Sequence, residues 1–268
     1  MTPGRGPPRP ALTHFLCIPL ATPASRPQLL ASLQAFHADV TSPHGMNVPE
    51  AAVRPVGTLH LTLGVMSFPK DEGLERAIAL LEGLKPRQIW ADIKPPRMPG
   101  QAAGGNGTTE KGKEVAGAGG RSGGDGLRVT LRGLRSMQPA SRASVLYAPP
   151  VDELGTLQQF CEKLKTAFED AELLVKDDRP LLLHATILNT IYAKGASRGS
   201  RGGRHGVKAG RESKPTLDAQ ELLDRYEDEV WMEDVPVERI AICKMGASKT
   251  VTDGVEDVAY EEIGAVAF

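Results

Sequence analysis

The chain has 268 residues, a hydrophobic content of 40% and a formal net charge of -1 at pH 7. This length allows a sizeable core in one large domain or two lobes, and the balanced charge excludes a global field that would draw the chain to nucleic acid or acidic membranes. The longest apolar run near the start, residues 15–21, is much shorter than the roughly 20 residues that span a bilayer. We therefore expect no membrane partner, and we interpret residues 1–12 as a disordered leader rather than a secretory signal.

Three cysteines, Cys17, Cys161 and Cys243, lie far apart in the sequence. Their spacing matches neither a zinc site nor a disulfide framework. Reduced thiols in the nucleus or the cytoplasm are the simplest interpretation. The sequence offers no cluster of metal ligands, so we expect no metal and no cofactor.

The first half of the chain predicts alternating strands and helices. Apolar, β-prone residues predict strands over 13–20 and 59–65, and helical spacing of apolar residues predicts helices over 28–40 and 71–84. Alternation of apolar and polar residues predicts a further strand over 88–94. Residues 99–126 are rich in glycine and almost free of large apolar side chains, which predicts a flexible insert.

The second half continues in the same way. Strands are predicted over 127–134, 145–147 and 181–192, with a long helix over 151–174 between the last two. A second flexible insert, residues 193–215, is strongly basic. A helix near 218–226 and strands near 237–245 and 258–268 complete the pattern. Mixed elements without a glycine-rich turn after the first strand favour an α+β fold with antiparallel sheets over a doubly wound nucleotide fold.

Two short strings share one design, Leu59-His60-Leu61-Thr62-Leu63 and Leu183-His184-Ala185-Thr186-Ile187. Successive side chains of a strand point to opposite faces, so histidine and threonine share one face and the apolar residues share the other. A single pair of this kind is a weak sign of function. Two alike, in a chain with six histidines, predict a common site.

The residue types of these strings suit phosphate chemistry. Histidine both accepts and donates a proton near neutral pH. If two lobes bring the strands together, His60 and His184 would act as general acid and base on one scissile bond, with their order left open. Thr62 and Thr186 would donate hydrogen bonds to the phosphate oxygens.

The basic insert supplies candidate RNA contacts at Arg198, Arg201, Arg204, Lys208 and Arg211. Clustered positive charge is enough to attract phosphate groups. A solvated insertion explains the same composition equally well.

The paired histidine-x-threonine strands resemble those of the 2H phosphoesterase superfamily. Segments 13–20, 59–65, 184–190, 217–219 and 237–243 resemble the branch shared by the nuclear-localisation-signal region of A-kinase anchor proteins and a subunit of the activating signal cointegrator complex. The resemblance implies a single bilobal domain over 13–268, apart from the two inserts, in which antiparallel sheets with flanking helices surround a central cleft.

The resemblance also implies a metal-independent phosphodiesterase. Its substrates would be 2',3'-cyclic phosphates or 2',5' linkages at RNA ends or in small nucleotides, with His60 and His184 catalytic and Thr62 and Thr186 holding the phosphate. The alternative is a nucleotide- or RNA-binding scaffold subunit with little turnover, in a nuclear transcription coactivator or repair complex. A purely protein-binding role would leave the paired polar faces unexplained.

Overall fold

The computed structural model describes residues 10–43, 46–93, 126–193, 215–252 and 255–268. Every strand pair in these ranges is antiparallel. The α-helices are α1 (Arg26–Thr41), α2 (Leu74–Gly83), α3 (Pro86–Ile93), α4 (Thr156–Asp170) and α5 (Gln220–Arg225), and the 3-10 turns are η1 (Glu50–Ala52), η2 (Val56–Thr58) and η3 (Ala140–Arg142). The strands are β1 (His14–Pro19), β2 (His60–Met66), β3 (Arg128–Arg132), β4 (Arg135–Ser136), β5 (Val145–Ala148), β6 (Ala185–Asn189), β7 (Val230–Pro236), β8 (Arg239–Lys244), β9 (Ser248–Thr252), β10 (Val255–Ala259) and β11 (Glu262–Ala267).

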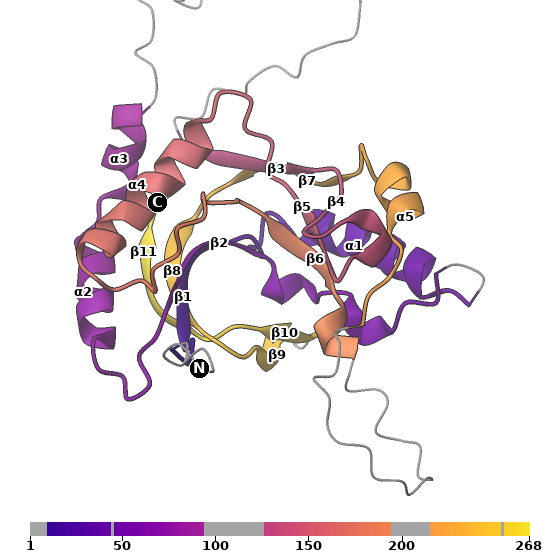
Figure 1. The fold of residues 1–268 in the computed structure, drawn as a ribbon. Helices are drawn as coiled ribbons and strands as arrows, with labels where there is room; N and C mark the ends of the chain where they lie inside the picture. The colour runs from indigo at the N-terminus through magenta and orange to yellow at the C-terminus, as the bar shows by residue number, and fades with distance from the viewer. Residues whose placement is uncertain (1–9, 44–45, 94–125, 194–214, 253–254) are drawn as a thin grey trace, which may run out of the picture.

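The first lobe is built on a four-stranded sheet in the order β11-β8-β1-β2. One face carries Leu16 and Ile18 of β1 and Leu61 and Leu63 of β2, all buried in the main core. α2 packs against β11 and β8, and α4 packs against β2, so helices cover this face (Figure 1). The alternation seen in the sequence thus sets which face is core.

The opposite face of this sheet holds a smaller buried cluster of Phe15, Cys17, Ala241 and Cys243. Cys17 is the cross-strand partner of both Thr62 and Ala241, so these three residues share the face. The sulfur atoms of Cys17 and Cys243 lie 3.7 Å apart without a disulfide, and all three cysteines of the chain are free and buried. Burial raises the pKa of the Cys17 thiol, as expected for a core residue.

The second lobe combines a three-stranded sheet, β4-β5-β6, with a two-stranded sheet, β3-β7. Residues 149–151, which follow β5, run along β3. The amide of Arg132 donates to the carbonyl of Pro149, and the amide of Val151 donates to the carbonyl of Thr130. These bonds join the two small sheets edge to edge.

Helices connect the lobes in a crossed arrangement. α1 follows the first strand of the first lobe but packs against β7 of the second, whereas α4 follows β5 of the second lobe and packs against β2 of the first (Figure 1). Phe36 of α1 meets Trp231 of β7 with 5.3 Å between ring centroids. Phe160 of α4 meets Phe268, just beyond β11, at 5.6 Å.

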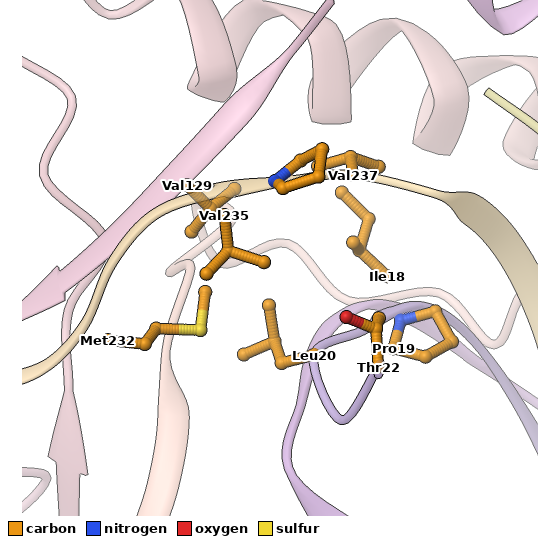
Figure 2. A pocket seen from close by; sticks show the side chains of 9 residues that line it. Ile18, Pro19, Leu20, Thr22, Val129, Met232, Val235 and Val237 are labelled. Carbon is orange, nitrogen blue, oxygen red and sulfur yellow. The ribbon is translucent and has the colours of Figure 1, made fainter. Parts of the chain in front are cut away.

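The end of β1 meets β3 and β7 through apolar side chains, which Figure 2 shows converging. Ile18, Leu20, Val129, Met232 and Val235 surround a cavity of about 10 Å³. This volume holds about one water-sized sphere. The junction of the lobes at this point is therefore core packing and not a ligand site.

β9 and β10 form a separate ribbon, β10-β9. β10 lies against η2, and a Cβ atom at Gly57 would come within 2.7 Å of the carbonyl oxygen of Val258. Arg26 of α1 pairs with Asp257 of β10 at 2.6 Å. A glycine and an ion pair thus anchor the ribbon, and Tyr260 follows it directly.

The α+β class with antiparallel sheets is confirmed, and most predicted elements are present. Strands at 13–20, 59–65, 127–134, 145–147 and 237–245 and helices at 28–40, 71–84 and 218–226 correspond to β1, β2, β3, β5, β8, α1, α2 and α5. The two inserts lie almost entirely outside the described residues. Within the described ranges, no helix combines the length and apolarity needed to cross a bilayer.

The predicted strand at 88–94 is wrong, because residues 88–93 belong to α3 and residue 94 lies outside the described residues. Ile89 and Ile93 alternate with polar residues, but they are also four apart and so share one helical face with Trp90. All three pack against the main core. Pro86 suits the first position of a helix, where its missing N–H costs nothing.

Other boundaries also differ. α4 is shorter than the predicted 151–174, because the Asp152 carboxylate accepts hydrogen bonds from the amides of Leu157 and Gln158 and fixes the start of the helix. The strand predicted over 181–192 is limited to β6. The single strand predicted over 258–268 is wrong, since β10 ends and β11 begins within it, and β4, β7 and β9 were not predicted.

Candidate active site

His60 is the first residue of β2, at the edge of the first lobe's sheet. Its Nδ1 lies 2.8 Å from the carbonyl oxygen of Thr58. A carbonyl only accepts, so Nδ1 donates and the Nε2 of a neutral ring is left as a proton acceptor. Thr62, two residues further on, is half-buried on the same face.

His184 repeats this arrangement in the second lobe. It directly precedes β6, and its Nδ1 donates to the carbonyl oxygen of Leu182 over 2.8 Å. Thr186 is the cross-strand partner of Tyr147, whose ring meets the His184 imidazole edge-on at 5.6 Å. Both strings therefore fold into the same local motif, a histidine bonded to the carbonyl two residues earlier.

The two motifs meet between the lobes. β2 and β6 contact each other, and the charge of His184 lowers the pKa of His60. The amide of Arg54 donates to the carbonyl of Ile187 on β6 over 2.9 Å, so the segment leading into β2 is bonded to the other lobe. Each edge strand thus brings its histidine toward the other.

Aromatic rings enclose His60. Phe15 lies 4.7 Å and Tyr260 5.3 Å from it between ring centroids. This burial lowers the pKa of His60 to about 4, with smaller contributions from the charges of His184 and Arg54. His60 is therefore neutral at physiological pH and can accept a proton at Nε2.

Sequence reasoning missed four residues at this site, namely Arg54, Tyr147, Tyr192 and Tyr260. The guanidinium carbon of Arg54 lies 3.9 Å from the centroid of the Tyr192 ring. Three of the chain's four tyrosines gather here. Burial, followed by the neighbouring Tyr192, raises the pKa of Tyr260. The one sequence signal was a lone arginine inside the apolar segment 51–56.

The predicted RNA contacts Arg198, Arg201, Arg204, Lys208 and Arg211 lie outside the described residues, as do His44 and His205. His14 is buried beside Phe68, and His37 belongs to α1. In the part of the chain that the structure describes, no group of three or more His, Cys, Asp and Glu side chains is arranged to hold a metal.

A family model described as the AKAP7 2'5' RNA ligase-like domain matches residues 12–259. The chain belongs to this family. Membership in the AKAP7 2'5' RNA ligase-like family confirms the resemblance to 2H phosphoesterases in their A-kinase anchor protein branch.

Individual proteins that are similar to this AKAP7 2'5' RNA ligase-like chain share at most 29% of the aligned residues with it. The uncharacterized protein C15D4.13c of Schizosaccharomyces pombe is 29% identical over 124 residues, 46% of this chain and 49% of that protein, so the match spans about half the length of this relative. A structure titled as a phosphoesterase is 17% identical, with a TM-score of 0.46 over 96% of this chain and 97% of its own. TT0787 of Thermus thermophilus is 17% identical, with a TM-score of 0.46 over 95% and 97%. Escherichia coli LigT complexed with 3'-AMP is 16% identical, with a TM-score of 0.44 over 96% and 97%.

Proposed function

We propose that the chain is a phosphodiesterase that opens 2',3'-cyclic phosphates or cleaves 2',5' linkages at RNA ends or in small nucleotides. His60 acts as the general base and His184 as the general acid. Thr62 and Thr186 hold the non-bridging oxygens of the phosphate. The observation that carries this proposal is the matched pair of imidazoles, each donating Nδ1–H to a backbone carbonyl at 2.8 Å, on edge strands that face each other across the lobes.

The different surroundings of the two rings support this assignment of roles. A base must be neutral before the reaction, and burial between Phe15 and Tyr260, which lowers the pKa of His60 to about 4, keeps that imidazole neutral. His184 has a single ring contact, with Tyr147, and both histidines are partly exposed. With the base role assigned to His60, the acid role is left to His184.

Atoms and protons balance in the proposed step. The Nε2 of His60 takes a proton from water, and the water oxygen forms a new bond to phosphorus. The bond from phosphorus to the leaving ribose oxygen breaks, and His184 in its imidazolium form donates its Nε2 proton to that oxygen. Hydroxyl hydrogen bonds from Thr62 and Thr186 stabilise the charge on the phosphate in the transition state. The two imidazoles alone supply acid and base.

The test is hydrolysis of nucleoside 2',3'-cyclic phosphates and of 2',5'-linked dinucleotides, with 3',5'-linked dinucleotides for comparison. His60→Ala and His184→Ala are each expected to lower kcat by a factor of about 10² to 10⁴, because each removes one proton-transfer group. Arg87→Gln, at an exposed position of α3, is the control and should retain the parent rate.

The outcomes distinguish a phosphodiesterase from a nucleotide-binding scaffold, the two functions that the sequence predicts. Equal rates for the parent and both alanine variants would remove the catalytic pair. Tight nucleotide binding by a parent protein that turns over none of these substrates would favour the scaffold role. Participation in a coactivator complex and the nuclear or cytoplasmic location remain predictions from the sequence.

A further inference from the structure

Arg54 occupies an unusual position for a charged residue. Its side chain and backbone together are 8% exposed, and its amide is bonded to β6 through the carbonyl of Ile187. Its guanidinium therefore lies inside the junction between η1, η2 and the second lobe. Burying a cation is unfavourable unless partners compensate for lost water.

The partners of the Arg54 guanidinium are aromatic. It lies over the ring of Tyr192 at 3.9 Å, and its charge opposes the rise in the pKa of the neighbouring Tyr260 phenol. Among the described residues, the ion pairs of arginine with carboxylate involve Arg26, Arg128, Arg132, Arg179, Arg225 and Arg239, and none involves Arg54.

A guanidinium has five N–H donors in a rigid fork that matches the oxygens of a phosphate. Stacking on the face of the Tyr192 ring uses none of these N–H donors. A buried cation with donors to spare, next to a proposed phosphate site, points to an anionic ligand group.

We propose that Arg54 holds a second phosphate of the substrate, next to the one that reacts between His60 and His184. This inference rests on the proposed function and narrows its substrate class. The preferred substrate would be a cyclic or 2',5'-linked nucleotide carrying one additional phosphate, such as a 5'-phosphorylated end, rather than a cyclic mononucleotide.

Tyr260 borders both Arg54 and His60, so a phosphate held by Arg54 would lie next to the reacting phosphate and would not be the one that reacts. Tyr260 contacts the His60 ring, and the charge of Arg54 acts on the pKa of the Tyr260 phenol, so Tyr260 is a neighbour of both. Arg54 is thus one side chain removed from the proposed base. Tyr192, 44% exposed, covers the guanidinium and offers aromatic surface on which a base can stack.

Negative charge in the groove next to Arg54 limits how many phosphates the ligand can carry. A groove of about 1080 Å³ between α1, η1 and β10 includes Arg54 in its wall, together with Glu50, Glu256 and Asp257. Arg26 neutralises Asp257, but the other two carboxylates would repel further phosphates. The structure therefore favours a short substrate with one extra phosphate over a long strand laid along this groove.

The kinetic test compares adenosine 2',3'-cyclic phosphate with the same nucleotide bearing a 5'-phosphate. Arg54→Gln should raise KM for the 5'-phosphorylated substrate by about tenfold to a hundredfold, as expected for loss of a charge-assisted contact, and change KM for the unphosphorylated one by less than about threefold. Arg54→Lys should give an intermediate loss. Arg87→Gln, at an exposed position of α3, should change neither.

Equal losses on both substrates, or no loss on either, would overturn the second-phosphate role. If Arg54→Gln does not fold, Tyr192→Leu tests the same site from its exposed side, and it should reduce the preference for the 5'-phosphorylated substrate. An unchanged preference in Tyr192→Leu and in Arg54→Lys would likewise refute the inference.

Calorimetric binding of two nucleotides that the reaction does not consume separates this inference from the proposed function. Adenosine 3',5'-bisphosphate should bind more tightly than adenosine 3'-monophosphate to the parent, and equally to Arg54→Gln. That result in a protein without turnover would retain the Arg54 site and reject the enzyme. Turnover of both cyclic substrates with no Arg54 effect on binding would reject the site and retain the enzyme.

Discussion

His60 and His184 make the same backbone hydrogen bond but lie in different surroundings. His60 is enclosed by two rings, whereas His184 meets one. The neighbouring elements create this difference, because Phe15 of β1 and Tyr260, which follows β10, contact His60, whereas Tyr147 of β5 contacts His184. Equivalent sequence strings thus acquire different aromatic neighbours.

Burial of His60 makes the free energy of unfolding depend on pH. The unfolded chain takes up a proton at this imidazole near pH 6.5, whereas the folded chain, with the pKa lowered to about 4, takes it up only near pH 4. The free energy of unfolding is therefore highest, as far as His60 determines it, above pH 6.5. It falls by at most about 3 kcal/mol as the pH falls toward 4. Urea unfolding at pH 7 and at about pH 4.5 measures it.

His60→Gln should flatten this part of the pH profile, because glutamine does not titrate. His14, whose pKa burial also lowers, contributes to both proteins and cancels in the comparison. Arg54, His184 and Tyr260 surround the ring and are unchanged by the substitution. A variant whose stability falls between these pH values as steeply as that of the parent would contradict the burial of His60.

The β9–β10 ribbon is the element that brings Tyr260 to His60. Its approach to η2 depends on Gly57, where an added Cβ would meet the Val258 carbonyl oxygen at 2.7 Å. Gly57→Ala should therefore displace the ribbon and lower the free energy of unfolding by about 1–3 kcal/mol, as overpacking does. It should also raise KM, since Tyr260 borders both His60 and Arg54.

Gly83→Ala is the matched control, because a Cβ at this position in α2 would have no atom within 4 Å. Urea unfolding and steady-state kinetics of both variants measure the effect. The same stability and KM in Gly57→Ala as in Gly83→Ala would exclude the proposed anchoring of the ribbon.

Elements with one dominant periodicity were predictable, and elements defined by tertiary contacts were not. The two His-Thr strings needed only the two-residue repeat of a strand. Residues 86–93 fit both a strand and a helix, and contact with the main core selects the helix. β9 lies in a polar segment and β7 has two acidic residues among its apolar ones, and both become strands by pairing with β10 and β3. Tyr260 reaches His60 from the distant β9–β10 ribbon, so no local pattern marks it.

The crossed helices couple the folding of the two lobes. α1 closes the second lobe and α4 closes the first, although each belongs by sequence to the other half. Unfolding either lobe exposes a helix face that the other half of the chain supplies. We therefore expect the lobes to unfold together, although the chain is larger than most two-state domains.

The chain's two tryptophans make this testable, because they report on different lobes. Trp90 lies on α3 against Phe160, and Trp231 lies on β7 against Phe36. Trp231→Phe leaves the first reporter and Trp90→Phe leaves the second. In each variant, the urea transition followed by tryptophan fluorescence should coincide with the transition followed by far-ultraviolet circular dichroism.

The two substitutions should lower the free energy of unfolding by different amounts. The buried Nε1 of Trp90 has no hydrogen-bond partner in the described structure, whereas that of Trp231 donates to the Gly133 carbonyl over 2.8 Å. Trp231→Phe should therefore lower the free energy of unfolding by about 1–3 kcal/mol more than Trp90→Phe, since it leaves a buried acceptor unpaired. A fluorescence transition that precedes the circular dichroism transition in either variant would mean that one lobe opens alone, and the crossed helices would then not couple the two halves of the site.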